Sequence, residues 1–282
     1  MNAIEMKHVS KTYSSFLLND ISLSLPTGCI MGLIGENGAG KSTTISLLMN
    51  TIQRDSGEIL ILGKDNLSSD FHQVKEDIGI VLDEAYFPEV LNVKNVNQIM
   101  RRTYKNWQED IFFHYLKQFQ LSERKLFKEY SRGMKMKLAI ATALSHQPKL
   151  LILDEATSGL DPIIRDEIIE IFNDFTREDD HSVLISSHII SDLEKISDYI
   201  AYLHQGNLVF CEEKDRLLEE YGILHISNED ISDIPKEAVL GRKDGSYAAT
   251  LCVRRSQISE SYDIEPAGIE DIMLFSAKQQ EV

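Results

Sequence analysis

The sequence predicts an α/β fold with a mostly parallel sheet, and three observations indicate it. Short apolar stretches typical of strands alternate with amphipathic stretches typical of helices, an order that favours parallel strands joined by helices. A glycine-rich loop at residues 35–43 stands between one such strand and an apolar helix. The apolar stretch at residues 149–153 runs directly into two acidic residues. Strand, glycine loop and helix in this order predict a phosphate-binding P-loop fold.

The first part of the chain contains most of the expected strands. A turn at Pro26, Thr27 and Gly28 separates the second strand from the third, since proline and glycine favour turns. The P-loop helix is expected at residues 43–49, and glycines bound the strand that follows it. The expected strands are residues 3–9, 21–25, 29–34, 57–63 and 78–82.

The middle of the chain is different, because long amphipathic stretches replace the strand signals. Helices are expected at residues 93–104, 109–119 and 134–146. They predict a helical subdomain, at about residues 85–147, inserted into the α/β core. Two buried strands at 149–153 and 182–186 then flank a helix at 163–175.

The character of the sequence changes again after about residue 210. A charged helix, two short strands and a last helix are expected at residues 212–221, 223–227, 247–253 and 269–275. We therefore predict a core domain at residues 1–210 and a small C-terminal α+β appendage at residues 211–282.

Composition excludes several classes of function. The formal net charge is −16 at pH 7, which argues against non-specific nucleic-acid binding and unaided docking on an anionic membrane. Cys29, Cys211 and Cys252 have no paired or metal-type spacing, so we expect free thiols in a reducing cytosol. We expect no signal peptide and no membrane span, since no apolar run approaches the roughly 20 residues a span needs. Any membrane role would then require a partner.

Residues 35–43 carry the clearest chemical signal. They read Gly-Glu-Asn-Gly-Ala-Gly-Lys-Ser-Thr and fit the pattern G-x-x-x-x-G-K-[ST]. Glycines let the backbone turn tightly and direct its N–H groups at phosphates. We expect the lysine to reach the β- and γ-phosphates and the serine hydroxyl to ligate Mg²⁺. The predicted nucleotide-binding residues are Gly35, Asn37, Gly38, Ala39, Gly40, Lys41, Ser42 and Thr43.

Two carboxylates follow the strand at residues 149–153. Asp154 is expected to hold Mg²⁺ together with Ser42, usually through water. Glu155, one residue further on, is expected to polarise the attacking water as a general base.

Three further motifs occur along the chain. Ser131-Arg132-Gly133-Met134 precedes the Asp154-Glu155 pair, and Ser158-Gly159-Leu160-Asp161-Pro162 and Ser187-His188 follow it. With the P-loop and the Asp154-Glu155 pair, this set resembles the nucleotide-binding subunit of ATP-binding-cassette (ABC) transporters over residues 1 to about 210. The resemblance implies ATP and Mg²⁺ as cofactors, a second ATPase subunit and a polytopic membrane permease as partners, and a place at the cytoplasmic face of the cell membrane.

The resemblance also assigns roles to residues outside the P-loop. Ser131 and Gly133 match the family's Leu-Ser-Gly-Gly-Gln signature, which contacts the γ-phosphate of ATP held by the opposite subunit. Asp161 matches a loop that crosses the dimer, and His188 matches a histidine that bridges γ-phosphate and the attacking water. Arg132 departs from the signature; a cation near phosphate and a solvent-facing side chain both remain open.

Two more positions are assigned by resemblance alone. Tyr13 matches the aromatic residue that stacks on adenine, although an edge-strand tyrosine is the alternative. Asp83, followed by Glu84, stands where the family has a glutamine after the strand at 78–82. Aspartate can ligate Mg²⁺ but adds negative charge beside phosphates, so a catalytic role and a solvated turn are both retained.

The last helix resembles a Leu-Glu-Asp-Ile-Phe segment in ATPases of the ABC-2 type. The Asp83 change and the signature Tyr130-Ser131-Arg132-Gly133-Met134 resemble a subgroup of Gram-positive exporters of antimicrobial or cytolytic peptides, phenol-soluble-modulin exporters among them. A soluble ABC ATPase of repair, translation or cluster assembly is the alternative. The acidic charge and the absence of basic arms disfavour nucleic acid as a partner. A regulatory module without turnover is disfavoured by the presence of Glu155 and His188.

Overall fold

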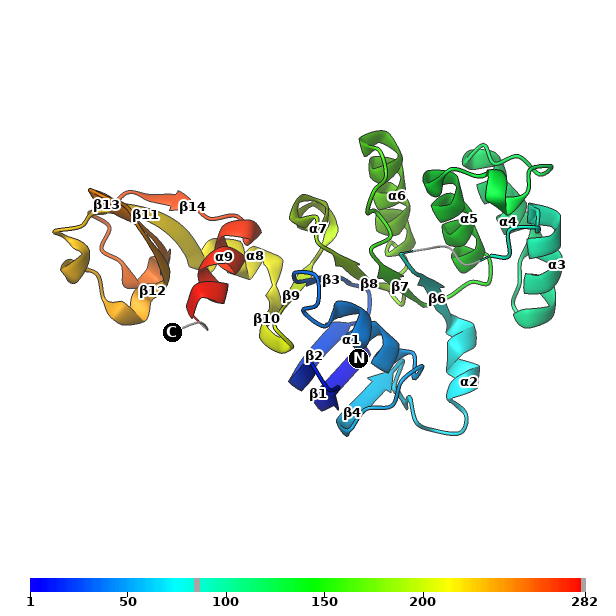
Figure 1. Cartoon of the computed structure of the whole chain (residues 1–282), viewed down its shortest axis with the longest axis horizontal. Helices are drawn as coiled ribbons and strands as arrows, with labels where there is room; N and C mark the ends of the chain where they lie inside the picture. Colours follow the sequence, from blue (N-terminus) through cyan, green and yellow to red (C-terminus); the bar gives the residue numbers. More distant parts are fainter. Residues whose placement is uncertain (84–86, 280–282) are drawn as a thin grey trace.

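The computed structural model describes residues 1–83 and 87–279 and confirms the α/β prediction. Figure 1 shows an elongated molecule with the P-loop region in the middle, helices α3–α5 at one end and a small sheet at the other. No helix in the described part of the chain is long and apolar enough to cross a membrane.

Within the described residues, one large sheet has the strand order β5-β4-β1-β2-β10-β9-β3-β8-β7-β6. The run from β9 to β6 is parallel, whereas β1, β2, β4 and β5 form an antiparallel section. The strands are β1 Asn2–Thr12, β2 Leu17–Pro26, β3 Ile30–Ile34, β4 Ser56–Ile61, β5 Lys64–Asp65, β6 Ile78–Val81, β7 Leu150–Asp154, β8 Ser182–Ser187, β9 Tyr199–His204 and β10 Asn207–Glu213.

Helices cover both faces of the parallel section and form the inserted region. The α-helices up to β9 are α1 Lys41–Leu48, α2 Phe71–Val74, α3 Val93–Thr103, α4 Glu109–Gln118, α5 Arg132–Leu144, α6 Pro162–Phe175 and α7 Ile190–Ile196. The 3-10 helices are η1 Lys75–Asp77, η2 Phe127–Glu129, η3 Ile231–Asp233, η4 Lys236–Ala238 and η5 Arg255–Gln257.

Local chemistry sets the helix starts. Helix α5 begins two residues earlier than predicted, because the Ser131 hydroxyl caps it by accepting a hydrogen bond from the Met134 N–H at 3.3 Å. Helix α6 has Asp161 as its cap and Pro162 in its first turn, a position where proline loses no helical bond.

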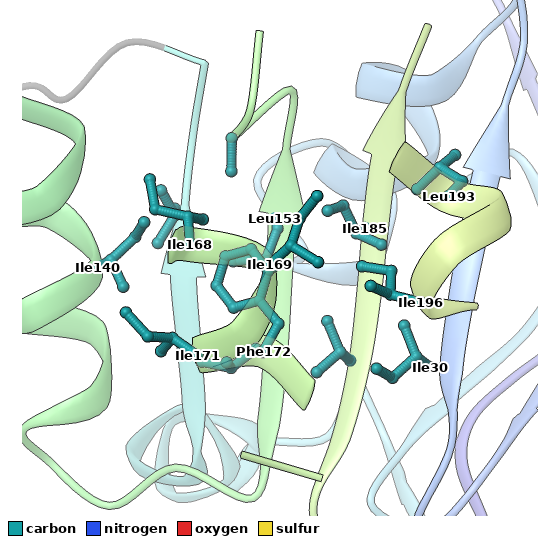
Figure 2. Packing of buried hydrophobic residues seen from close by; sticks show 14 of the residues in the cluster. Ile30, Ile140, Leu153, Ile168, Ile169, Ile171, Phe172, Ile185, Leu193 and Ile196 are labelled. Atoms are coloured by element: carbon teal, nitrogen blue, oxygen red, sulfur yellow. The ribbon is translucent and has the colours of Figure 1, made fainter. Parts of the chain in front are cut away.

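The core lies on both faces of the parallel strands, and every residue of β3, β7 and β8 is buried. Because side chains alternate along a strand, Leu153 and Ile185 face α5, α6 and α7, whereas Ile152 and Leu184 face α1. Figure 2 shows α6 residues, Ile168 among them, packed in the first of these layers.

The C-terminal region has a second sheet with the order β12-β13-β11-β14. Its elements are α8 Lys214–Glu220, β11 Tyr221–Ser227, β12 Val239–Asp244, β13 Ala248–Arg254, β14 Ile264–Pro266 and α9 Ile269–Gln279. Helix α8 starts later than predicted, because β10 continues its pairing with β9 as far as Glu213.

Helix α9 packs into the core of the large sheet. Its buried Ile269, Ile272 and Phe275 belong to the same apolar cluster as Leu193 and Ile196 of α7. The division at residues 210 and 211 remains a prediction, since the first sheet ends at Glu213 and the cluster extends across that boundary.

We expect Ile168→Ala to destabilise the protein by about 2–5 kcal/mol, because Ile168 is fully buried and its truncation leaves a cavity. The matched control is Ile163→Ala on the same helix, where the side chain is 82% exposed and the change should stay within about 0.5 kcal/mol. Urea unfolding of both variants measures the difference. Equal effects of the two changes would contradict this packing.

Candidate functional site

A cavity of about 700 Å³ lies at the carboxyl ends of the parallel strands. The loop after β3, Asp83 after β6, Glu155 after β7 and His188 after β8 all line it. This edge of an open α/β sheet is where ligands generally bind, because the strands end there and their loops are free to vary. The described lining residues are Ser15, Phe16, Glu36, Asn37, Gly38, Gly40, Lys41, Ser42, Thr43, Asp83, Arg132, Glu155, Ser158 and His188.

The geometry of the glycine loop suits an anion. Gly40 has φ +114°, and a Cβ there would lie 2.8 Å from the Leu18 side chain, so glycine is required. Helix α1 begins immediately afterwards at Lys41, and no side chain caps it. The N–H groups of a first helical turn have no partner within the helix, and they carry the positive end of its dipole. The loop therefore offers the donors that a phosphate chain needs.

Lys41 is a buried cation at the floor of the cavity. Its Nζ donates hydrogen bonds to the carbonyl oxygens of Gly35 at 2.7 Å and Glu36 at 3.3 Å. It also lies 3.6 Å from Oε1 of Glu155. A charge this far from solvent requires partners of this kind, and anionic phosphate oxygens would suit it at least as well.

Glu155 joins two cationic or basic groups. One carboxylate oxygen faces Lys41, and the other lies 2.6 Å from Nδ1 of His188. The backbone of Glu155 is left-handed, with φ +52°, and its N–H donates to the carbonyl and hydroxyl oxygens of Ser186, both at 3.1 Å. A non-glycine residue in this conformation is uncommon and is often found at functional sites.

Asp154 lies below the cavity surface. It is 6% exposed, and the Ser186 hydroxyl donates to its carboxylate at 2.5 Å. Ser42 and Asp83 line the cavity itself. No group of three potential metal ligands gathers within residues 1–83 and 87–279. These sparse oxygen donors fit Mg²⁺, which usually keeps several waters and is shared with substrate phosphates.

Several predicted site residues lie outside the described cavity lining. Tyr13 is 43% exposed, with the Lys11 Nζ 5.8 Å from its ring centroid. Ser131 and Asp161 cap α5 and α6, and the buried Gly133 packs against Ile164 between these helices.

Gly35 and Ala39 shape the loop from beneath. Ala39 is buried, and a Cβ at Gly35 would lie 2.5 Å from the Leu203 carbonyl oxygen. Gly35 is thus needed for the close approach of the loop to β9.

Ser15, Phe16 and Glu36 also line the cavity, although the sequence did not indicate them as site residues. The Glu36 carboxylate lies 3.0 Å from Nδ1 of His204 and accepts the Gln205 N–H at 3.4 Å, so β9 holds the loop in place. Burial, with a smaller contribution from Glu36, raises the pKa of Tyr202 to about 12 and keeps its phenol neutral. No local sequence pattern predicts the contact between Glu36 and His204, because these residues lie 168 positions apart in the chain. The position of Phe16, an aromatic residue three positions after Tyr13, is a sequence signal that could have identified it. Glu84 lies outside the residues that the structure describes.

Residues 18–158 match the model of the family described as ABC transporter. The chain is 34% identical to the bacitracin transport ATP-binding protein BcrA of Enterococcus faecalis, covering 73% of this chain and 68% of that protein. It is 33% identical to the lantibiotic transport ATP-binding protein SrtF of Streptococcus pyogenes, with 75% and 91% covered. It is 32% identical to the ABC transporter ATP-binding protein YtrB of Bacillus subtilis, with 77% and 74% covered.

Solved structures agree with this match. An ATP-binding subunit of an ABC transporter superposes with a TM-score of 0.70 at 26% identity, covering 76% of this chain and 91% of that one. A dimeric ATP-binding cassette bound to ADP and Pi superposes with a TM-score of 0.67 at 24% identity, with 74% and 98% covered. The predicted P-loop ABC ATPase fold is confirmed.

We expect Lys41→Ala to weaken ATP binding at least tenfold, because charge-assisted hydrogen bonds contribute roughly 1.5–3 kcal/mol each. Calorimetry with ATP measures the affinity. The control is Lys64→Ala, which removes a largely exposed lysine that pairs with Asp70 away from the cavity. Equal ATP affinity in both variants would exclude Lys41 from phosphate binding.

Proposed function

Because the chain belongs to the ABC transporter family as an ATP-binding, ATP-hydrolysing subunit, we propose that it drives export of a peptide or peptide-like antimicrobial through a separate membrane permease. Two relatives are named for transport of bacitracin and of a lantibiotic, and these names support the substrate class.

The observation that carries the proposed mechanism is the position of Glu155 between Lys41 and His188. Phosphoryl transfer to water needs cations on the phosphate oxygens and an acceptor for the proton of the attacking water. Lys41 supplies the cation at the helix start. The Glu155 carboxylate lies 3.6 Å from it, close enough to act on a water beside the same phosphate group. His188 holds the second oxygen of that carboxylate and thereby orients it.

The loop residues bind and orient the nucleotide. Backbone N–H groups of residues 37–43 would surround the phosphates, and Gly38 and Gly40 have positive φ angles that glycine adopts without strain. Ser42 and Asp154 would hold Mg²⁺, which neutralises charge on the phosphate oxygens when bound. Asp83 adds a carboxylate to the same cavity and is proposed as a further site residue.

A dimer completes the proposed site. Ser131 and Gly133 stand at the start of α5, where unpaired N–H groups and the helix dipole suit the γ-phosphate of ATP held by a second subunit. Asp161 stands at the start of the neighbouring α6. Tyr13, with its ring exposed near the cavity residues Ser15 and Phe16, is proposed to stack on adenine.

A soluble ABC ATPase without a transport partner is the alternative function. The net charge of −16 disfavours action on nucleic acid. The relatives named for transport favour the exporter, which would place the chain at the cytoplasmic face of the membrane beside its permease.

We expect Glu155→Gln to lower ATP turnover by roughly 10²–10⁴-fold while ATP still binds, since the amide cannot accept the proton. Phosphate release measures turnover, and calorimetry measures ATP affinity. Asp174→Asn, an exposed acid on α6 paired with Arg177, is the control. Turnover near the wild-type rate in Glu155→Gln would remove Glu155 from the proposed mechanism.

The transport role is tested by affinity purification of the tagged chain from its native host in mild detergent. We expect a polytopic membrane protein to co-purify, and the complex to export labelled peptide from cells only when Glu155 is intact. Recovery of the chain with ribosomes, repair factors or assembly proteins, and without a membrane protein, would support the soluble alternative instead.

A further inference from the structure

Helix α7 follows His188 after a single residue, and its side chains tie it to two other helices. On one side Asp192 lies 3.6 Å from Arg165 of α6, and Lys195 donates to Asp166 of α6 at 3.1 Å. Asp192 is buried, so the first of these ion pairs is shielded from solvent. The position of His188 therefore depends on how α7 is held.

On the other side Glu194 ties α7 to the C-terminal helix. Its Oε1 accepts the backbone N–H of Ile269, the first residue of α9, at 2.7 Å. This is a carboxylate at the start of an 11-residue helix, so the helix dipole reinforces a charge-assisted hydrogen bond. The Lys214 Nζ donates to the Glu194 carbonyl oxygen at 2.9 Å, so the start of α8 is tied to the same residue.

Helix α9 also lies across a small cavity from the catalytic loops. The cavity has a volume of about 310 Å³, and its lining includes Glu36 and His188 on one side and Met273 and Leu274 on the other. Beneath it, Ile269 and Ile272 of α9 pack in one cluster with Leu193 of α7. Helix α9 thus contacts α7, the helix that follows His188, and lines the cavity that His188 also lines.

From these contacts we infer that Glu194 is a positioning residue for ATP hydrolysis, which couples α9 to His188 through α7. The inference rests on the proposed role of His188 beside Glu155. Loss of the Glu194 carboxylate removes the hydrogen bond between α7 and the start of α9, so α7 is positioned less precisely and His188 orients the Glu155 carboxylate less well. Nucleotide contacts made by the P-loop do not change, because α7 supplies none of them.

The test compares Glu194→Ala, Glu194→Gln and Glu219→Ala in the full-length protein. Glu219 is an exposed glutamate on α8, so Glu219→Ala makes the same change of residue and charge while leaving the Glu194–Ile269 hydrogen bond in place. We expect Glu194→Ala to lower kcat about tenfold with KM for ATP unchanged, since small displacements of a catalytic group cost rate rather than binding. Glutamine keeps an acceptor for the Ile269 N–H and should restore most of kcat. Glu219→Ala should match the wild type.

A double-mutant cycle tests whether Glu194 acts through His188. If it does, His188→Ala combined with Glu194→Ala is no slower than His188→Ala alone. Multiplied losses in the double variant would overturn the inference, as would an unchanged kcat in Glu194→Ala or an equal loss in Glu194→Gln. Thermal unfolding of each variant identifies a general loss of structure, which would also count against a positioning role.

Failure of the underlying function gives a different result. If wild-type protein does not hydrolyse ATP, or if Glu155→Gln hydrolyses it normally, the proposed mechanism fails before Glu194 is considered. If those two proteins behave as expected and Glu194→Ala behaves like the wild type, only the coupling through α7 is refuted.

Discussion

Burial of the parallel strands on both faces is the constraint on which the rest of the structure depends. Strands β3, β7 and β8 have no exposed residue, so they accept only apolar or hydrogen-bonded side chains along their length. Polar chemistry is confined to the points where these strands end. Because the strands are parallel, those points share one edge, and Lys41, Glu155 and His188 meet there although they come from distant parts of the chain. Helix α7 begins at the same edge, just after His188, so its contact with α9 connects the C-terminal helix to this group of residues.

The sequence predicted the features that are encoded locally. The glycine loop, the apolar strands and the Asp154-Glu155 pair each lie within a few residues of the chain. In the structure the glycine loop and Glu155 line one cavity, and Asp154 lies at the end of β7 just outside that lining. The strands β5, β9, β10, β12 and β14 were not predicted. Strand β12 includes Gly241, Arg242 and Lys243, and such residues give no strand signal by themselves. Its pairing with β13 stabilises it instead.

Contacts between distant residues were also beyond reach of the sequence. The pair formed by Glu36 and His204 and the pair formed by Glu194 and Ile269 depend on tertiary structure alone. Ser131 was predicted as a motif residue, but its role as the cap of α5 was not predicted, because several neighbouring positions could begin the helix equally well. The motif residues were therefore predictable, whereas the residues that hold them in place were not.

The strand order has a consequence for biosynthesis. Strand β3 leads into the nucleotide loop, and its neighbours in the sheet are β8 and β9, which end at Ser187 and His204. A ribosome therefore completes the loop long before the strands that hold it have been made. During that interval β3 is an unpaired apolar segment, the kind of segment that chaperones protect from aggregation. The ability to bind nucleotide should thus appear late in translation, after β9 has left the exit tunnel.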